Sequence, residues 1–171
     1  MTPSNTTSPG TIPSGMNTSG MTTSIRRAGP RDLDALTVLF DAYRRFYGQP
    51  ADLARARDWL RTRMRFGESV VFIAERDGVA AGFTQLYPMF SSVRTARTWI
   101  LNDLFVADDA RRTGVARALL DAATQYARDD GAVGISLETT RDNTAARALY
   151  RAAGWHEDAT QWYSQALTPP L

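Results

Sequence analysis

The residues with the clearest chemical implication lie between Leu104 and Ala116. An apolar strand ends in this segment, a polar turn follows, and a helix begins at Gly114, which small residues flank. The first N–H groups of a helix have no partner inside it, and the helix dipole adds positive potential there. Arg111 and Arg112 can add charge-assisted contacts. The segment therefore predicts a binding loop for an anionic phosphate, although an ordinary helix start with two solvated arginines has the same composition.

Two other kinds of phosphate loop do not match the chain. GxxxxGK(S/T) is missing from the sequence, which argues against a nucleotide triphosphatase. GxGxxG does not follow a strand, which argues against a dinucleotide-binding fold.

A second informative segment runs from Asp142 to Trp155 and follows another apolar strand. Asn143 suits the N-cap position of a short helix, where its side chain can accept from a backbone N–H. Tyr150 lies seven residues later, two turns along the same face. The simpler interpretation of Asn143 is capping alone, and that of Tyr150 is core packing. The two residues indicate a chemical role only in combination with the first segment.

Hydrophobic periodicity predicts the elements that position both segments. Strands are expected over residues 24–28, 69–75, 80–87, 98–106, 133–139 and 161–167, and helices over residues 30–47, 53–64, 115–130 and 143–153. Asp77-Gly78 is a two-residue hairpin signal, and residues 88–97 are expected to form a loop. The order β-α-α-β-β-β-α-β-α-β, with a parallel crossover over residues 98–139, predicts an α/β (α+β) fold with a central mixed sheet flanked by helices.

Composition narrows the possible chemistry. The 171 residues include no cysteine, which excludes disulfides, thiolate nucleophiles and cysteine-based zinc sites. His156 is the single histidine, so no metal is expected. The formal charge of +2 is small, and the arginines are spread along the chain without a basic cluster. No nucleic-acid partner is therefore expected.

The N-terminal residues 1–23 differ from the rest of the chain. They are rich in Thr, Ser, Pro, Gly and Asn, which predicts a disordered tail before a single domain over residues 24–171. The tail lacks the charged start and apolar stretch of a secretory signal, and no apolar run is long enough for a transmembrane helix. We expect a cytoplasmic protein without membrane association.

Together, the two segments resemble a known family. RRTGVA at residues 111–116 is similar to the pyrophosphate signature R/Q-x-x-G-x-G/A of the GNAT superfamily of N-acetyltransferases. NTAARALYRAAGW at residues 143–155 resembles the family's N-x-x-A-x-x-L-Y-x-x-x-G-F/W helix. The spacing between them, one helix and one strand, is also the family's. The resemblance covers residues 24–167 and implies the GNAT acyl-CoA N-acyltransferase fold, with acetyl-CoA as co-substrate.

The resemblance also implies roles for individual residues. The pyrophosphate of CoA would be held by the Arg111 side chain and by the backbone amides that follow it, at Arg112, Thr113, Gly114, Val115 and Ala116. The pantetheine arm would pair with the end of the preceding strand, at Leu104, Phe105 and Val106. Asn143 would hydrogen-bond the same arm. Tyr150 would lie near the thioester sulfur and act as the acid that protonates the departing thiolate.

The family's reaction is direct acetyl transfer to an amine, and a chain without cysteine cannot form an acetyl-cysteine intermediate. An alkylammonium has a pKa near ~10.4, so a base should help to free its lone pair at neutral pH. Asp103 is the expected base, because relatives often carry a carboxylate about there, and strand alternation would place it and Asn102 on opposite faces. Glu138 is the second candidate. A backbone N–H near Phe105 or Val106 could polarise the carbonyl.

The acceptor is less sharply indicated. The Phe46-Tyr47 pair, Phe90 and the strand over residues 101–106 look like the branch that contains histone, polyamine and D-amino-acid acetyltransferases. That branch implies a small amine, an amino acid, a polyamine or a peptide lysine. Phe46, Tyr47, Met89 and Phe90 could form an aromatic wall for a cationic amine, or they could belong to the core.

Other features bear on the acceptor and on partners. Arg94 and Arg97 favour an acceptor that also carries a carboxylate. Members of the branch are often dimers, so a homodimer is a further expectation, in which the apolar C-terminal strand could be exchanged or paired. A catalytically silent CoA-binding regulatory module of the same fold is the alternative to an enzyme.

Overall fold

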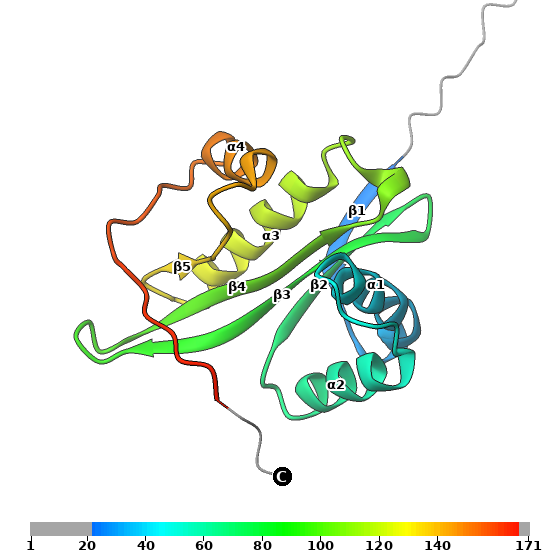
Figure 1. Ribbon diagram of the computed structural model, residues 1–171, viewed down its shortest axis with the longest axis horizontal. Helices are drawn as coiled ribbons and strands as arrows, with labels where there is room; N and C mark the ends of the chain where they lie inside the picture. The colour runs from blue at the N-terminus through cyan, green and yellow to red at the C-terminus, as the bar shows by residue number, and fades with distance from the viewer. Residues whose placement is uncertain (1–21, 168–171) are drawn as a thin grey trace, which may run out of the picture.

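The computed structural model describes residues 22–167, which form one five-stranded sheet with the strand order β1-β2-β3-β4-β5 (Figure 1). The strands are β1 (Thr23–Arg27), β2 (Val70–Arg76), β3 (Val79–Ser91), β4 (Ala96–Val106) and β5 (Ile135–Ser136). The first four pair antiparallel, and β5 pairs parallel to β4. The mixed sheet expected from the sequence is therefore confirmed.

Helices cover both faces of this sheet. They are α1 (Leu33–Phe46), α2 (Leu53–Arg65), α3 (Val115–Asp129) and α4 (Thr144–Ala152), and short 3-10 helices precede α1 (Pro30–Asp32) and α3 (Asp108–Ala110). α1 and α2 lie on one face, and α3 lies on the other with α4 beyond it (Figure 1). The four α-helices expected from periodicity are all present.

The strands divide their buried side chains between two cores, as β2 shows. Val71 and Ile73 pack with residues of α1 and α2, whereas Phe72 and Ala74 pack with residues of α3. Successive side chains of a strand point to opposite faces, and both faces of this sheet are covered. For that reason β2 is apolar over a continuous run instead of alternating with polar residues.

The turn from β2 to β3 has the geometry that its dipeptide predicts. Asp77 has a φ of 49° and Gly78 a φ of 81°, and positive φ at both central residues is typical of a type I′ turn. The N–H of Thr22 donates a 3.0 Å hydrogen bond to the Asp77 side chain. Thr22 and Thr23 therefore belong to the fold and not to the predicted tail, and residues 1–21 lie outside the described residues.

β3 and β4 form one long hairpin where a loop was expected over residues 88–97. Their pairing extends from Gly82 opposite Val106 to Ser91 opposite Ala96. β2 accompanies β3 only as far as Leu86, so the rest of β3 has a free edge. Pro88 lacks an N–H and is tolerated on such an edge. The prediction of a loop was wrong, because Pro88 on this free edge does not interrupt the pairing of β3 with β4.

The strands expected near the C-terminus are shortened or missing. β5 covers only Ile135–Ser136 in place of residues 133–139, because the chain beyond it leaves β4 and leads to α4. Residues 161–167 form no strand, and Trp162, Tyr163 and Leu167 are exposed. This segment passes across β4 and β3 in Figure 1 without pairing with either strand. Apolar alternation alone therefore misled the prediction, because a strand also needs a hydrogen-bonded neighbour.

Candidate active site

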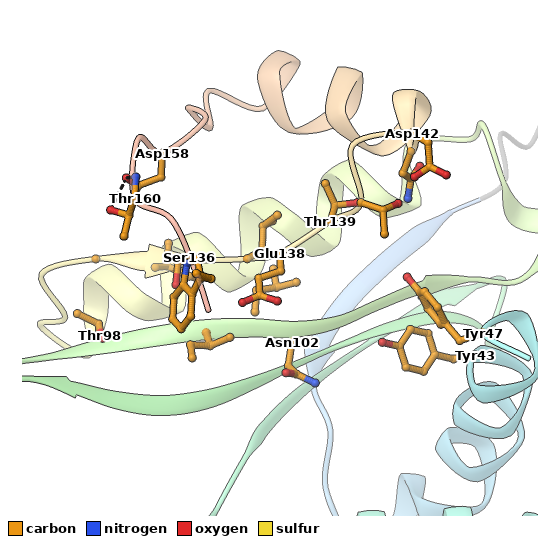
Figure 2. Close-up of a pocket in the computed structure, with 18 of the residues that line it drawn as sticks. Tyr43, Tyr47, Thr98, Asn102, Ser136, Glu138, Thr139, Asp142, Asp158 and Thr160 are labelled. Carbon is orange, nitrogen blue, oxygen red and sulfur yellow. Dashed lines mark hydrogen bonds between the residues drawn. The ribbon is translucent and has the colours of Figure 1, made fainter. Parts of the chain in front are cut away.

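A cleft opens where β4 and β5 separate. The two strands pair only at Trp99 with Ile135 and at Ile100 with Ser136. Beyond this short contact lies a cleft of about 1070 Å³. Its walls come from β4, the chain after β5, the C-terminal end of α1 and the segment after α4 (Figure 2).

The main chain of β4 presents hydrogen-bonding groups to this gap. The N–H of Ala107 donates a 2.9 Å hydrogen bond to the carbonyl of Ala81 in β3. An antiparallel ladder alternates, so the N–H of Phe105 also faces β3, and those of Leu104 and Val106 face the gap. Of the two N–H groups expected to polarise a carbonyl, that of Val106 is therefore the one on the open side of β4.

A β-bulge on β4 shapes the wall of the cleft. Gln85 pairs with Asp103 and Leu86 pairs with Leu101, so Asn102 is the extra residue. A bulge interrupts the alternation of side chains. Asn102 and Asp103 consequently lie together, and Nδ2 of Asn102 donates a 3.1 Å hydrogen bond to Oδ1 of Asp103. The expectation that they point to opposite faces was wrong, because it assumed a regular strand.

Asp103 lies directly behind the cleft wall. It is only 4% exposed, its Oδ1 accepts a 3.1 Å hydrogen bond from the Asn102 amide, and the Tyr43 hydroxyl interacts with the carboxylate. Burial raises the pKa of Asp103, and the interactions with Tyr43 and Asn102 lower it in part. Tyr43 and Asn102 both line the cleft. The carboxylate therefore meets the cleft through these two side chains.

Tyr43 is a site residue that the sequence did not indicate. Its helical spacing with Leu36 and Phe40 assigned it to the core-facing side of α1. Its ring does pack in an edge-to-face manner on Phe83, yet its hydroxyl points toward the cleft (Figure 2). Burial and the nearby charge of Asp103 raise the pKa of Tyr43, so the hydroxyl keeps its proton. The one signal in the sequence for a role in the site was a polar hydroxyl on an otherwise apolar helix face.

The predicted phosphate loop has a backbone suited to an anion. Arg112 has a φ of 61° and Gly114 a φ of 89°, and Thr113 fastens the turn through a 2.6 Å hydrogen bond to the carbonyl of Ala110. No side chain caps α3, whose first hydrogen bond joins the N–H of Ala118 to Gly114. The N–H groups of the first turn therefore have no partner within the helix.

The Arg111 side chain contacts the end of β4 and the turn before α3. Its guanidinium forms a 2.7 Å ion pair with Asp108 and donates a 3.2 Å hydrogen bond to the carbonyl of Val106. It also lies over the rings of Phe46 and Phe105, at 5.8 and 5.9 Å from their centroids. No contact of Arg111 tests a role in holding a pyrophosphate, so this role stays a prediction.

Asn143 and Tyr150 occupy neighbouring cavities. Oδ1 of Asn143 caps α4 by accepting a 3.2 Å hydrogen bond from the N–H of Ala146, and Asn143 also lines the cleft. Tyr150 is half-buried beside Trp155 and lines an adjoining pocket of about 480 Å³ that shares residues 135–139 with the cleft. Burial raises the pKa of Tyr150. Residues 135–139 thus line both cavities, and Tyr47, which lines the cleft, also contributes to the raised pKa of Tyr150.

The charged side chains of the cleft are mainly acidic. Glu138, Asp142 and Asp158 line it, against Arg94 as the one arginine among the described lining residues. Glu138 extends toward β4 in Figure 2. Arg97 does not line the cleft and pairs instead with Asp130 at 3.3 Å.

Only part of the expected aromatic wall is present. Phe46 and Tyr47 line the cleft together with Trp162, which the sequence analysis did not include. Met89 and Phe90 are exposed on the β3–β4 hairpin and do not line it. The wall was predicted from the apolar and aromatic character of these residues alone. The long β3–β4 hairpin places Met89 and Phe90 outside the cleft.

The sequence profile of the acetyltransferase (GNAT) family matches residues 33–155. The chain belongs to this family. A GNAT relative from Bacillus subtilis (strain 168), named "Uncharacterized N-acetyltransferase YhfO", is 48% identical over 134 residues, which are 78% of this chain and 90% of the relative. A "Probable acetyltransferase" of Haemophilus influenzae is 40% identical over 96 residues, 56% of this chain and 66% of that protein.

Solved structures agree with the GNAT assignment. A crystal structure of a probable acetyltransferase superposes with a TM-score of 0.82 at 40% identity, covering 86% of this chain and 99% of that one. An aminoglycoside N-acetyltransferase in complex with CoA superposes with a TM-score of 0.73 at 23% identity, covering 88% and 99%, and shares the fold. The expected GNAT fold and acetyl-CoA-dependent acetyltransferase class are confirmed. The histone, polyamine and D-amino-acid branch stays a prediction.

Within residues 22–167, no three His, Asp or Glu side chains gather closely enough to hold a metal ion. The helices over the same residues include none long and apolar enough to cross a membrane.

Proposed function

We propose that this GNAT acetyltransferase moves the acetyl group from acetyl-CoA directly to a primary amine bound in the cleft beside β4. The bulge at Asn102 carries the proposal, because it brings the buried carboxylate of Asp103 to the cleft wall. The same strand then leads to the uncapped start of α3. The proposed proton acceptor, Asp103, therefore lies on the strand that leads directly to the proposed anion-binding start of α3.

The first half of the site suits acetyl-CoA as co-substrate. The free N–H groups at the start of α3 and the left-handed backbone at Gly114 favour a pyrophosphate. The gap-facing N–H groups of Leu104 and Val106 suit the carbonyls of a pantetheine arm, which would add to β4 like a further strand. Asn143 lies across the cleft from β4 and can hydrogen-bond the same arm.

The second half of the site suits the transfer itself. An ammonium has no lone pair, so the acceptor must lose a proton before its nitrogen attacks the thioester carbonyl. Asp103 is the base of this proposal, since burial makes its carboxylate a better proton acceptor than an exposed one. As the C–S bond breaks, Tyr150 protonates the thiolate. The raised pKa of Tyr150 means that it holds this proton at neutral pH.

The charge of the cleft favours a cationic acceptor. Three carboxylates, those of Glu138, Asp142 and Asp158, face a single arginine there. Phe46, Tyr47 and Trp162 add aromatic rings that attract cations. Among a small amine, an amino acid, a polyamine and a peptide lysine, the acceptor that these walls suit best therefore carries more than one positive charge. Among the described lining residues, Arg94 is the one cation that could meet a free carboxylate of the acceptor.

Release of CoA thiol from acetyl-CoA tests this proposal. The protein contains no cysteine, so every free thiol detected comes from CoA. Diamines and polyamines, aminoglycosides, lysine peptides and D- and L-amino acids are compared as acceptors at equal concentration. Amine-dependent release, fastest with polycationic acceptors, is the expected result. Tight acetyl-CoA binding without release for any amine would instead support the silent CoA-binding module.

A further inference from the structure

We propose that Tyr43 is a catalytic residue of this site, which takes a proton from the acceptor ammonium on its hydroxyl oxygen and passes its own proton to Asp103. The inference rests on the proposed amine acetylation and adds the group that touches the acceptor. It begins from the difference in exposure between the two side chains. Tyr43 lines the cleft, whereas Asp103 is 4% exposed and does not line it.

Direct contact between an acceptor and Asp103 is hindered by burial, because the carboxylate is 4% exposed and lies behind residues that line the cleft. The Asn102 amide donates a 3.1 Å hydrogen bond to this carboxylate, and the Tyr43 hydroxyl, which lines the cleft, interacts with it. An amide N–H₂ donates hydrogen bonds but does not exchange its protons readily with a base. A hydroxyl has one proton to donate and lone pairs to accept another. Of the two, only Tyr43 can connect an ammonium in the cleft to the carboxylate behind it.

The ring of Tyr43 is held in place by other aromatic rings. It packs against Phe83 at 5.9 Å, Phe105 at 6.3 Å and Phe40 at 6.0 Å between centroids. Tyr47 adds an edge-to-face contact at 5.1 Å. These contacts come from β3, β4 and α1, so the hydroxyl is positioned by three elements. A fixed hydroxyl can form its hydrogen bond to Asp103 without a loss of side-chain entropy in each turnover.

Within residues 22–167, the groups that act on Asp103 include no cation. Asn102 on β4 and Tyr43 on α1 interact with the carboxylate. After burial, the charge of Asp103 also raises the pKa of Tyr87 on β3. Gln85 lies opposite Asp103 on β3, donates to the Tyr87 hydroxyl, and leaves its own Oε1 buried without a partner. The charge of Arg63 on α2 partly offsets this rise in the pKa of Tyr87. The carboxylate therefore keeps the basicity that burial confers.

The proton transfer balances in three steps. An N–H bond of the acceptor ammonium breaks as its proton moves to the oxygen of Tyr43, and the original hydroxyl proton forms an O–H bond with Asp103. The neutral amine attacks the thioester carbon, the C–S bond breaks, and Tyr150 gives its proton to the thiolate. The second proton of the nitrogen returns to Tyr150 through water, and Asp103 releases its proton to solvent. One proton is released for each amide formed.

The test compares Tyr43→Phe with the wild-type protein over a range of pH. The phenylalanine keeps the ring contacts and removes the hydroxyl. For an alkylamine acceptor, kcat/KM should fall by about 10- to 100-fold near neutral pH. The loss should shrink to about threefold or less as the pH approaches the amine pKa of ~10, where the acceptor is already neutral. Tyr126→Phe removes the hydroxyl of a tyrosine on α3, outside the site, and should match the wild type.

Two further measurements separate a relay from a structural role. Asp103→Asn should show the same pH-dependent loss, and the double variant should be no slower than the slower single variant, because both groups serve one step. The wild-type rate in mixtures of H₂O and D₂O should curve with deuterium content, as expected when two protons move together. This last measurement needs no variant and therefore stands even if Tyr43→Phe fails to fold.

The outcomes distinguish this inference from the proposed function. A loss that is constant across pH, or a linear dependence on deuterium content, would overturn the relay while amine-dependent thiol release leaves the proposed function intact. The absence of release with wild-type protein would overturn both.

Discussion

The Asn102 side chain donates a hydrogen bond to the carboxylate of Asp103, the next residue along the same strand, at 3.1 Å. Neighbours on a regular strand point to opposite faces and cannot make this contact. The bulge opposite Gln85 and Leu86 permits it. One extra residue in β4 thus converts a buried strand aspartate into a group with access to the cleft through its partners.

Asn102→Ala tests this relationship. The hydrogen bond from Asn102 lowers the pKa of Asp103, so its removal should raise that pKa further above the ordinary range. The acidic limb of the pH dependence of kcat/KM should move to higher pH, with the plateau rate changed by less than about threefold. An unshifted acidic limb, measured from initial rates of thiol release, would show that Asp103 does not control it.

Asp103→Asn should make the protein more stable near neutral pH while it loses activity. A pKa raised by burial means that the folded state binds the Asp103 proton more tightly than the unfolded state does. The stability from this group is present at low pH and is lost as the pH rises through the folded pKa. The thermal midpoint of the variant should therefore exceed that of the wild type near neutral pH, and the difference should vanish toward about pH 4.

The control for this measurement is Asp109→Asn, which removes an exposed carboxylate before α3. Its midpoint should stay close to that of the wild type at each pH. If Asp103→Asn were less stable than the wild type near neutral pH, the charged form of Asp103 would be stabilising, and burial would not dominate its environment.

Gly114→Ala should weaken acetyl-CoA binding by roughly tenfold or more, equivalent to about 1.4 kcal/mol. Gly114 has a φ of 89° and open space around its Cβ position, so a methyl group would be strained and would also occupy the side from which a phosphate approaches. Isothermal titration with acetyl-CoA measures the effect.

Gly131→Ala is the matched variant, because Gly131 has a φ of 72° at the other end of α3, with equally open surroundings. The left-handed conformation should cost each variant a similar ~1–2 kcal/mol of stability. Only the variant at position 114 should lose affinity for acetyl-CoA. Equal affinities for the two variants would remove the loop from the binding site.

Tyr150→Phe should lower kcat by ~10- to 1000-fold, the effect expected for loss of a general acid. Affinity for acetyl-CoA should change little, because the ring and its contact with Trp155 at 6.5 Å are retained. Single-turnover rates of thiol release and acetyl-CoA titrations measure the two quantities separately. A kcat equal to that of the wild type would assign Tyr150 to the packing of α4 alone.

Local signals in the sequence predicted the elements that depend on few residues. Asp77-Gly78 specified its turn through positive φ, and Asn143 specified the start of α4 through one hydrogen bond. Gly114 marked the start of α3 in the same way. Each of these depends on residues within one turn of chain, so composition and spacing are sufficient to find them.

Features that depend on distant partners could not be predicted. The bulge at Asn102 exists only in relation to the register of β3, and the pairing of Pro88 depends on where β2 ends. The role of Tyr43 depends on the position of Asp103, sixty residues later in the sequence and on another element. Local signals therefore indicated the proposed CoA side of the candidate site, but they did not indicate Tyr43 on the proposed acceptor side.

The most direct test of amine acetylation is to measure CoA thiol and N-acetylated product together, with wild-type protein, acetyl-CoA and the fastest amine of the panel. Mass spectrometry identifies the acetylated nitrogen, and thiol titration counts the CoA released. The proposed reaction predicts one acetamide for each thiol and no release without amine. Thiol release that proceeds equally without amine, or release without an acetylated product, would contradict it.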